Sequence, residues 1–130
     1  MAQKQEQVFA AANVDGSGRV AFALSNSVFA SVVYGAVTMT LDAGQTFNRQ
    51  FDYRILDAAG NILFDAPLVL FNSGSKIVYL SPSASVGLGG TYLQLPEMPV
   101  PPGGSIAIDV VNGNIDTNDT VALAVVLDYS

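Results

Sequence analysis

The sequence predicts an all-β domain, specifically an antiparallel two-sheet β-sandwich that is jelly-roll-like and has about eight to ten short strands. Apolar and polar residues alternate with a period of two along most of the chain, and Gly, Asn, Asp, Ser and Pro interrupt the alternation at short intervals. No stretch has the period of an amphipathic helix, and there is no internal repeat or interdomain linker. The alternation by itself fits an immunoglobulin-like strand order as well as a jelly roll.

The length of 130 residues is enough for one hydrophobic core. We expect a polar N-terminal arm over residues 1–7 and a single sandwich over 8–130. Strands are expected, in chain order, over 8–14, 19–24, 28–34, 37–41, 47–56, 62–64, 68–71, 76–80, 91–95, 105–111 and 120–129.

Several of these segments carry further information. Residues 28–41 can form one long bent strand, and Pro67 marks an edge or a kink. In 47–56 the alternation puts Arg49 on the apolar face, whereas the face of Asn48, Gln50, Asp52 and Arg54 is expected to meet water. The Ser- and Gly-rich segment 81–90 reads as a long loop, and 96–104 as a stiff, proline-rich connection. The last strand is apolar on both faces, which is typical of a central or covered strand.

The composition points to a surface that another subunit covers. Half of the residues are apolar and only 12% are charged, compared with about 25% charged in an ordinary domain. The mean hydropathy is +0.39, yet no apolar run is long enough for a membrane-spanning helix. The net charge is −6, and the cations do not cluster beyond Arg49 and Arg54, so nucleic acid and membrane are not expected partners. We predict self-association.

The residues absent from the sequence argue against common catalytic chemistry. Without histidine or cysteine the chain has no Ser-His-Asp triad, thiol nucleophile, disulfide or thiolate metal site, and we predict a non-enzymatic protein without a cofactor. The absence of cysteine and of an apolar leader at the polar start fits a protein made in a reducing cytoplasm. Carboxylate pairs for hydrolysis could be Asp52 with Asp57 or Asp116 with Asp119, but turn-forming contexts favour a structural role.

A polar loop near the C-terminus places oxygen-bearing side chains at alternating positions, as calcium-binding loops do. It has only two carboxylates and no following bidentate glutamate, and its Asn-Gly pair is also a common hairpin turn, so no metal is predicted. The calcium candidates are Asn112, Asn114, Asp116, Asn118 and Asp119.

Tyrosines provide the alternative functional hypothesis, a carbohydrate-binding or adhesion module. Aromatic rings on a sheet can stack on sugars, although tyrosines within apolar runs more often pack at a sheet edge with the hydroxyl in water. The chain has no tryptophan, and its tyrosines are Tyr34, Tyr53, Tyr79, Tyr92 and Tyr129.

The segment 95–129 leads from a proline-rich approach, Pro99-Val-Pro-Pro-Gly-Gly104, into a Ser-Ile-Ala-Ile-Asp-Val strand and a terminal Thr-Val-Ala-Leu-Ala-Val-Val-Leu strand. In this segment, and in being small, acidic, cysteine-free and sparsely charged, the chain resembles accessory virion proteins of tailed bacteriophages, namely head decoration or cement proteins, and more loosely jelly-roll capsid proteins. The resemblance implies a virion protein, assembled in the host cytoplasm, that forms a homo-oligomer, often a trimer, and contacts a major capsid or other virion protein.

Contacts in such an assembly are expected from the N-terminal arm, residues 1–7, and from two loops, residues 81–90 and residues 97–104. Prolines in the second loop reduce the entropy lost on binding. The candidate interaction residues are Gln3, Gln5, Gln7, Val86, Leu88, Met98, Val100 and Pro101.

Overall fold

The computed structural model describes residues 4–13, 19–25, 29–42, 48–81, 91–112 and 119–129. Within these residues the chain is built from strands, and it has no helix that is long and apolar enough to cross a membrane. The nine strands of the described part are β1 (Lys4–Asn13), β2 (Arg19–Ala23), β3 (Ala30–Leu41), β4 (Arg49–Leu56), β5 (Ile62–Phe71), β6 (Gly74–Ser81), β7 (Thr91–Gln94), β8 (Ser105–Asn112) and β9 (Thr120–Tyr129).

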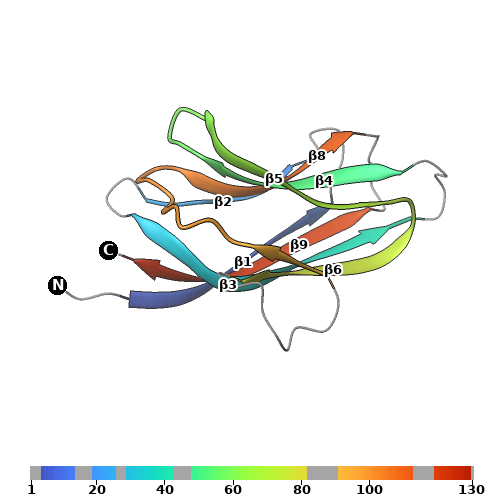
Figure 1. The fold of residues 1–130 in the computed structure, drawn as a ribbon, viewed down its shortest axis with the longest axis horizontal. Coiled ribbons are helices and arrows are strands. Elements are labelled where there is room, and N and C mark those ends of the chain that lie inside the picture. Colours follow the sequence, from blue (N-terminus) through green and yellow to red (C-terminus); the bar gives the residue numbers. More distant parts are fainter. Residues whose placement is uncertain are drawn as a thin grey trace.

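The strands form two layers that face each other (Figure 1). Sheet A has the order β1-β9-β3-β6-β7, and sheet B has the order β2-β8-β4-β5. All neighbouring strands are antiparallel except β6 and β7, which are parallel. The prediction of an all-β, two-sheet sandwich is therefore confirmed.

The strand pairs are nested along the chain. β1 pairs with β9, β2 with β8, β3 with β6 and β4 with β5, so that each of these pairs lies inside the previous one in sequence. The pairs β3–β9 and β4–β8 then join the nested pairs into the two sheets. β9 consequently lies between β1 and β3, and both of its backbone edges are paired.

The core lies between the sheets and follows the alternation in the sequence. In β9 the residues Val121, Leu123, Val125 and Leu127 are at most 1% exposed. From sheet B, Phe51 packs on Phe71 with ring centroids 5.9 Å apart, and Tyr53 packs edge-on against Phe64 at 6.1 Å. The inner face of β4 is thus the one predicted, with Arg49 on it.

β1, β3 and β5 each bear on a predicted boundary. β1 begins at Lys4, so residues 4–7 of the expected arm pair with β9. β3 is one continuous strand with a register shift between Val32 and Tyr34, as the bent-strand alternative predicted. β5 continues through Pro67, which is tolerated because β5 is an edge of sheet B.

Candidate interaction surface

The outer face of sheet A carries almost no charge. In β3 the residues Val37, Met39 and Leu41 are buried, so the intervening side chains point away from the core. The same alternation holds in β9, β6 and β7. We call this surface the neutral face, and its described side chains include Tyr34, Ala36, Thr38 and Thr40 of β3, Ala122, Ala124 and Val126 of β9, Ile77 and Tyr79 of β6, and Tyr92 and Gln94 of β7.

Charge is confined to one end of this surface. Among the described side chains, Asp128 near the end of β9 is the only charged one that the alternation places on the neutral face. Large apolar side chains are nevertheless exposed there: Tyr34 by 58%, Ile77 by 45% and Tyr92 by 41%. Exposed apolar side chains on a surface without charge are typical of a surface that binds a partner.

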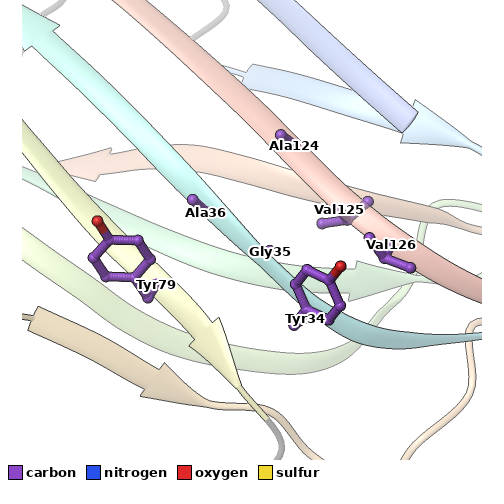
Figure 2. A pocket seen from close by; sticks show the side chains of 7 residues that line it. All are labelled: Tyr34, Gly35, Ala36, Tyr79, Ala124, Val125 and Val126. Atoms are coloured by element: carbon purple, nitrogen blue, oxygen red, sulfur yellow. The ribbon is translucent and has the colours of Figure 1, made fainter. Parts of the chain in front are cut away.

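A groove of about 250 Å³ lies on the neutral face between Tyr34 and Tyr79. Figure 2 shows the two rings on either side of Gly35 and Ala36, with Ala124 on the neighbouring strand β9. The register places Ala36 between Tyr79 of β6 and Ala124 of β9, so a row of small side chains forms the floor.

The irregularity in β3 sets the position of one wall of the groove. The register with β9 shifts between Val32 and Tyr34, which leaves Val33 as an extra residue and puts Tyr34 opposite Val126. A bulge of this kind changes the direction of the next side chains. Gly35 follows directly, and a Cβ atom there would overlap the carbonyl oxygen of Ala124 and lie 2.9 Å from Cγ1 of Val125. The floor therefore requires glycine at this position.

The five tyrosines of the sequence separate into two groups. Tyr79 and Tyr92 are register partners across β6 and β7, and Tyr34 stands across the groove from Tyr79. Tyr53 is fully buried, its hydroxyl has no hydrogen-bond partner among the described residues, and burial raises its pKa. Tyr129 is half-buried against the core. Three tyrosines thus share the neutral face.

The outer face of sheet B is charged, and its charges are paired across strands. Arg19 of β2 donates two hydrogen bonds to Asp109 of β8, at 2.6 and 2.7 Å. Arg54 of β4 donates to Asp109 at 3.0 Å and to Asp65 of β5 at 3.1 Å. This ladder connects all four strands of the sheet. The face of β4 that was expected to meet water is also partly covered, since Asp52 is only 9% exposed.

Asp52 and Asp65 form a carboxyl pair beside the ladder. Burial and, second to it, a hydrogen bond with Asp65 together raise the pKa of Asp52 to about 6, while a hydrogen bond from Gln50 and the charge of Arg54 oppose the rise. The same hydrogen bond lowers the pKa of Asp65, and Arg54 adds to that lowering. The pair lies on sheet B and contributes nothing to the groove on sheet A.

Asp57, the second carboxylate named with Asp52 from the sequence, has a structural role. Oδ1 of Asp57 accepts hydrogen bonds from the backbone of Ala59 and Asn61 in the β4–β5 hairpin, at 3.0 and 2.8 Å. Its bonds with Asn61 lower the pKa of Asp57. Asp57 therefore stabilises the turn of this hairpin. Asp116 lies outside the described residues.

Asp119 is not available as a calcium ligand. It is fully buried, and its Oδ2 lies 3.2 Å from Nη1 of Arg49, which is also fully buried. Its Oδ1 accepts the backbone N–H of Asp42 at 2.7 Å, and Arg49 also donates to the carbonyl oxygen of Asn72. Asp119 is therefore removed from the calcium candidates, because its carboxylate neutralises a buried guanidinium.

The remaining calcium candidates lie at or beyond the end of β8. Asn112 is the last residue of that strand, whereas Asn114, Asp116 and Asn118 fall outside the described residues. Across the residues that are described, no group of three or more carboxylates is placed to hold a metal ion.

The predicted contact residues are only partly at the surface. Gln5 and Gln7 belong to β1 and pair with Asp128 and Val126 of β9. Met98 is half-buried against the core, and Val100 is fully buried. Gln3, Val86 and Leu88 lie outside the described residues.

Val100 is held inside by backbone pairing. It exchanges two hydrogen bonds with Ala30, at 3.1 and 2.6 Å, and its role as a contact residue was predicted wrongly. Pro101, which is half-buried, begins a turn closed by the N–H of Gly104 at 2.9 Å. Gly103 in that turn has φ 74°, which favours glycine. The proline-rich segment thus packs on the sandwich and does not extend from it.

Comparisons of this chain with protein-family models, with curated proteins and with solved structures give no match.

Proposed function

We propose that this protein is a non-enzymatic structural component of a viral particle, of the kind represented by the head decoration and cement proteins of tailed bacteriophages, and that it acts through protein–protein contacts. The neutral face carries the proposal. It combines exposed rings and aliphatic side chains with an almost complete absence of charge, and such a surface is stabilised when another protein covers it.

The two outer faces of the sandwich support a division of roles. On sheet B, Arg19 and Arg54 are held by carboxylates of the same chain, so these cations are already neutralised within the monomer. On sheet A, Tyr34 and Ile77 are exposed without a charged neighbour among the described side chains of the face. Removing water from the outer face of sheet A when a partner binds would therefore cost little free energy of desolvation.

The strand order supports the jelly-roll assignment. When β7 is set aside, the sheets read β1-β9-β3-β6 and β2-β8-β4-β5, which is the order produced by folding one long antiparallel hairpin into two Greek keys. β7 is then a short strand added in parallel at the edge next to β6.

The named carboxylates support a non-catalytic role. Asp57 holds a turn and Asp119 neutralises Arg49. Asp52 has the raised pKa that catalytic acids often have, but its neighbours are the ion pairs of sheet B and the groove is on the other sheet.

Sedimentation of purified particles from the source of the protein tests the proposal, with an antibody against the chain as the detector. The protein should migrate with intact particles and remain with them after washing in about 0.5 M salt, because contacts through a neutral face depend little on salt. A protein that stays at the top of the gradient, and does not bind emptied shells when added back, would overturn the proposal.

A carbohydrate-binding or adhesion module is the second candidate, because Tyr34, Tyr79 and Tyr92 share the neutral face. Neighbouring rings on one sheet can stack on successive sugar units. Glycan-array binding followed by calorimetry would favour this function if Tyr79→Ala and Tyr92→Ala each lost most of the affinity. Tyr129→Phe, altered next to the core, is the matched control.

A further inference from the structure

The neutral face is the surface on which two copies of this chain can meet without repelling each other. Each copy has a net charge of −6, and like charges brought together in an interface are strongly unfavourable. The outer face of sheet B presents Asp65, whose side chain is 38% exposed. On the described strands of sheet A the corresponding surface is neutral up to Asp128. Charge therefore directs self-association to sheet A.

The shape of the neutral face is self-complementary, because it has a projecting side chain next to a groove. Tyr34 projects from the face, being 58% exposed, and it borders a groove of about 250 Å³. A projection and a hollow side by side on one surface are what a two-fold interface needs, because each copy then offers both to the other. Figure 2 shows Tyr34 and the small residues Gly35 and Ala36 adjacent to one another on β3.

The small side chains at the floor of the groove do not extend far enough to contact a flat partner surface packed on the neutral face. Packed sheets lie about 10 Å apart and fill that space with interdigitating side chains. Ala36 and Ala124 reach only a small part of that distance, whereas a tyrosine ring from the opposing copy would fill it. The area is also adequate. The strands of sheet A, from β1 to β7 across the sheet, have 10, 10, 12, 8 and 4 residues. At the usual rise and strand spacing they cover roughly 700 Å² in projection, close to the ~800 Å² per partner of a stable interface.

We propose that a second copy of this chain covers the neutral face across a two-fold axis, and that Tyr34 of each copy fills the groove between Tyr34 and Tyr79 of the other. This inference rests on the proposed function for its expectation of self-association, and it specifies the surface and the symmetry. A two-fold contact makes dimers, whereas the resemblance to decoration proteins implies trimers, so mass alone separates the two.

The first test is sedimentation equilibrium of the full chain at concentrations up to about 100 µM. The wild-type protein should be a dimer, and Ala124→Arg, which puts a long cation on the floor, should raise the dissociation constant more than tenfold. Leu70→Arg on β5, where Leu70 is 53% exposed, is the matched control and should leave the dimer intact. Circular dichroism and thermal unfolding must show that both variants are folded.

The second test uses the absence of cysteine in the sequence. Ala36→Cys changes little in size and places a single thiol at the floor of the groove. In the dimer the ring of Tyr34 from the other copy covers this thiol, so a maleimide should label it much more slowly at protein concentrations where the dimer forms than at dilutions where it dissociates. Ala21→Cys, on the exposed face of β2, should be labelled equally fast at both concentrations.

The results separate the inference from the proposed function. A wild-type monomer, a trimer, or a dimer that survives Ala124→Arg and leaves the thiol of Ala36→Cys unprotected would overturn the two-fold interface. A monomer or trimer that still sediments with particles would leave the proposed function standing. A dimer that binds no particle would support the interface and reject the function. A wild-type monomer that binds glycans through Tyr34 and Tyr79 would assign the groove to sugar.

Discussion

Arg49 of β4 and Asp119 at the start of β9 form an ion pair that joins the two sheets inside the protein, with 3.2 Å between Nη1 and Oδ2 and no exposure of either side chain. Asp42 and Asn72, which follow β3 and β5, bond to the same pair through their backbones. Four chain segments are thus fixed at one end of the sandwich by two side chains.

Removing one member of this pair should be strongly destabilising. Asp119→Ala leaves the guanidinium of Arg49 buried without its counter-charge, and we expect a loss of about 3–5 kcal/mol in the free energy of unfolding. Urea denaturation followed by fluorescence measures it. The double variant Arg49→Met, Asp119→Ala should lose less than the sum of the single losses, since no charge remains buried. Additive losses would contradict the pairing.

The carboxyl group of Asp52 should make stability depend on pH. Its pKa is raised to about 6, first by burial and then by the hydrogen bond with Asp65. A raised pKa in the folded state stabilises the fold fully below the unfolded value of 3.8, and this contribution is lost as the pH rises through about 6. Relative to the wild type, Asp52→Asn should therefore gain stability between about pH 4 and pH 8, on the order of 1 kcal/mol.

Asp57 is the matched control for that titration. Its pKa is lowered by hydrogen bonds within the hairpin, so its contribution is present at high pH and is lost as the pH falls. Asp57→Asn should consequently lose stability relative to the wild type only as the pH rises through the range below 3.8, and its difference from the wild type should stay constant between about pH 4 and pH 8. Parallel profiles for the two variants would show that the assignment of Asp52 is wrong.

The hydroxyl of Tyr53 should contribute nothing to stability. The ring is fully buried, and the hydroxyl has no partner among the described residues. Tyr53→Phe keeps the contact with Phe64 and removes the unsatisfied group, so the free energy of unfolding should stay constant or rise by up to about 1 kcal/mol. Phe51→Leu, at a comparable depth in the core, should instead cost about 1 kcal/mol. A marked loss in Tyr53→Phe would mean that the hydroxyl is bonded.

Gly35 should not tolerate even one additional methyl group. In Gly35→Ala the new carbon would overlap the carbonyl oxygen of Ala124 in the centre of sheet A, and we expect a cost of about 1–3 kcal/mol. Ala36→Ser, one residue further and on the outer face, should change stability by less than about 0.5 kcal/mol. Thermal unfolding of both variants measures the difference, and equal melting temperatures would argue against the close approach of β3 and β9.

Local patterns in the sequence were sufficient to predict the strands and which face of each strand is buried. Val121, Leu123 and Val125 alternate with smaller residues, and these three form part of the core. Arg49 also followed the alternation, even though a charged residue on an apolar face is an exception to the usual rule.

The surfaces could not be predicted in the same way, because they depend on which strands are neighbours. Tyr34 and Tyr79 are far apart in the sequence and meet only because β3 pairs with β6. Asp119 looked like a loop ligand, since nothing near it in the chain indicates that Arg49 lies beside it. Val100 looked like an exposed loop residue, and its pairing with Ala30 buries it.

The central place of β9 has a consequence for biosynthesis. This strand is the only described link between β1 and β3, although it is made after both of them. On the ribosome, the edges of β1 and β3 that pair with β9 stay without their hydrogen-bond partners until residues 120–129 have left the exit tunnel. Sheet A therefore completes after translation of this segment, and a nascent chain stalled before Thr120 is the form most exposed to chaperones and to aggregation.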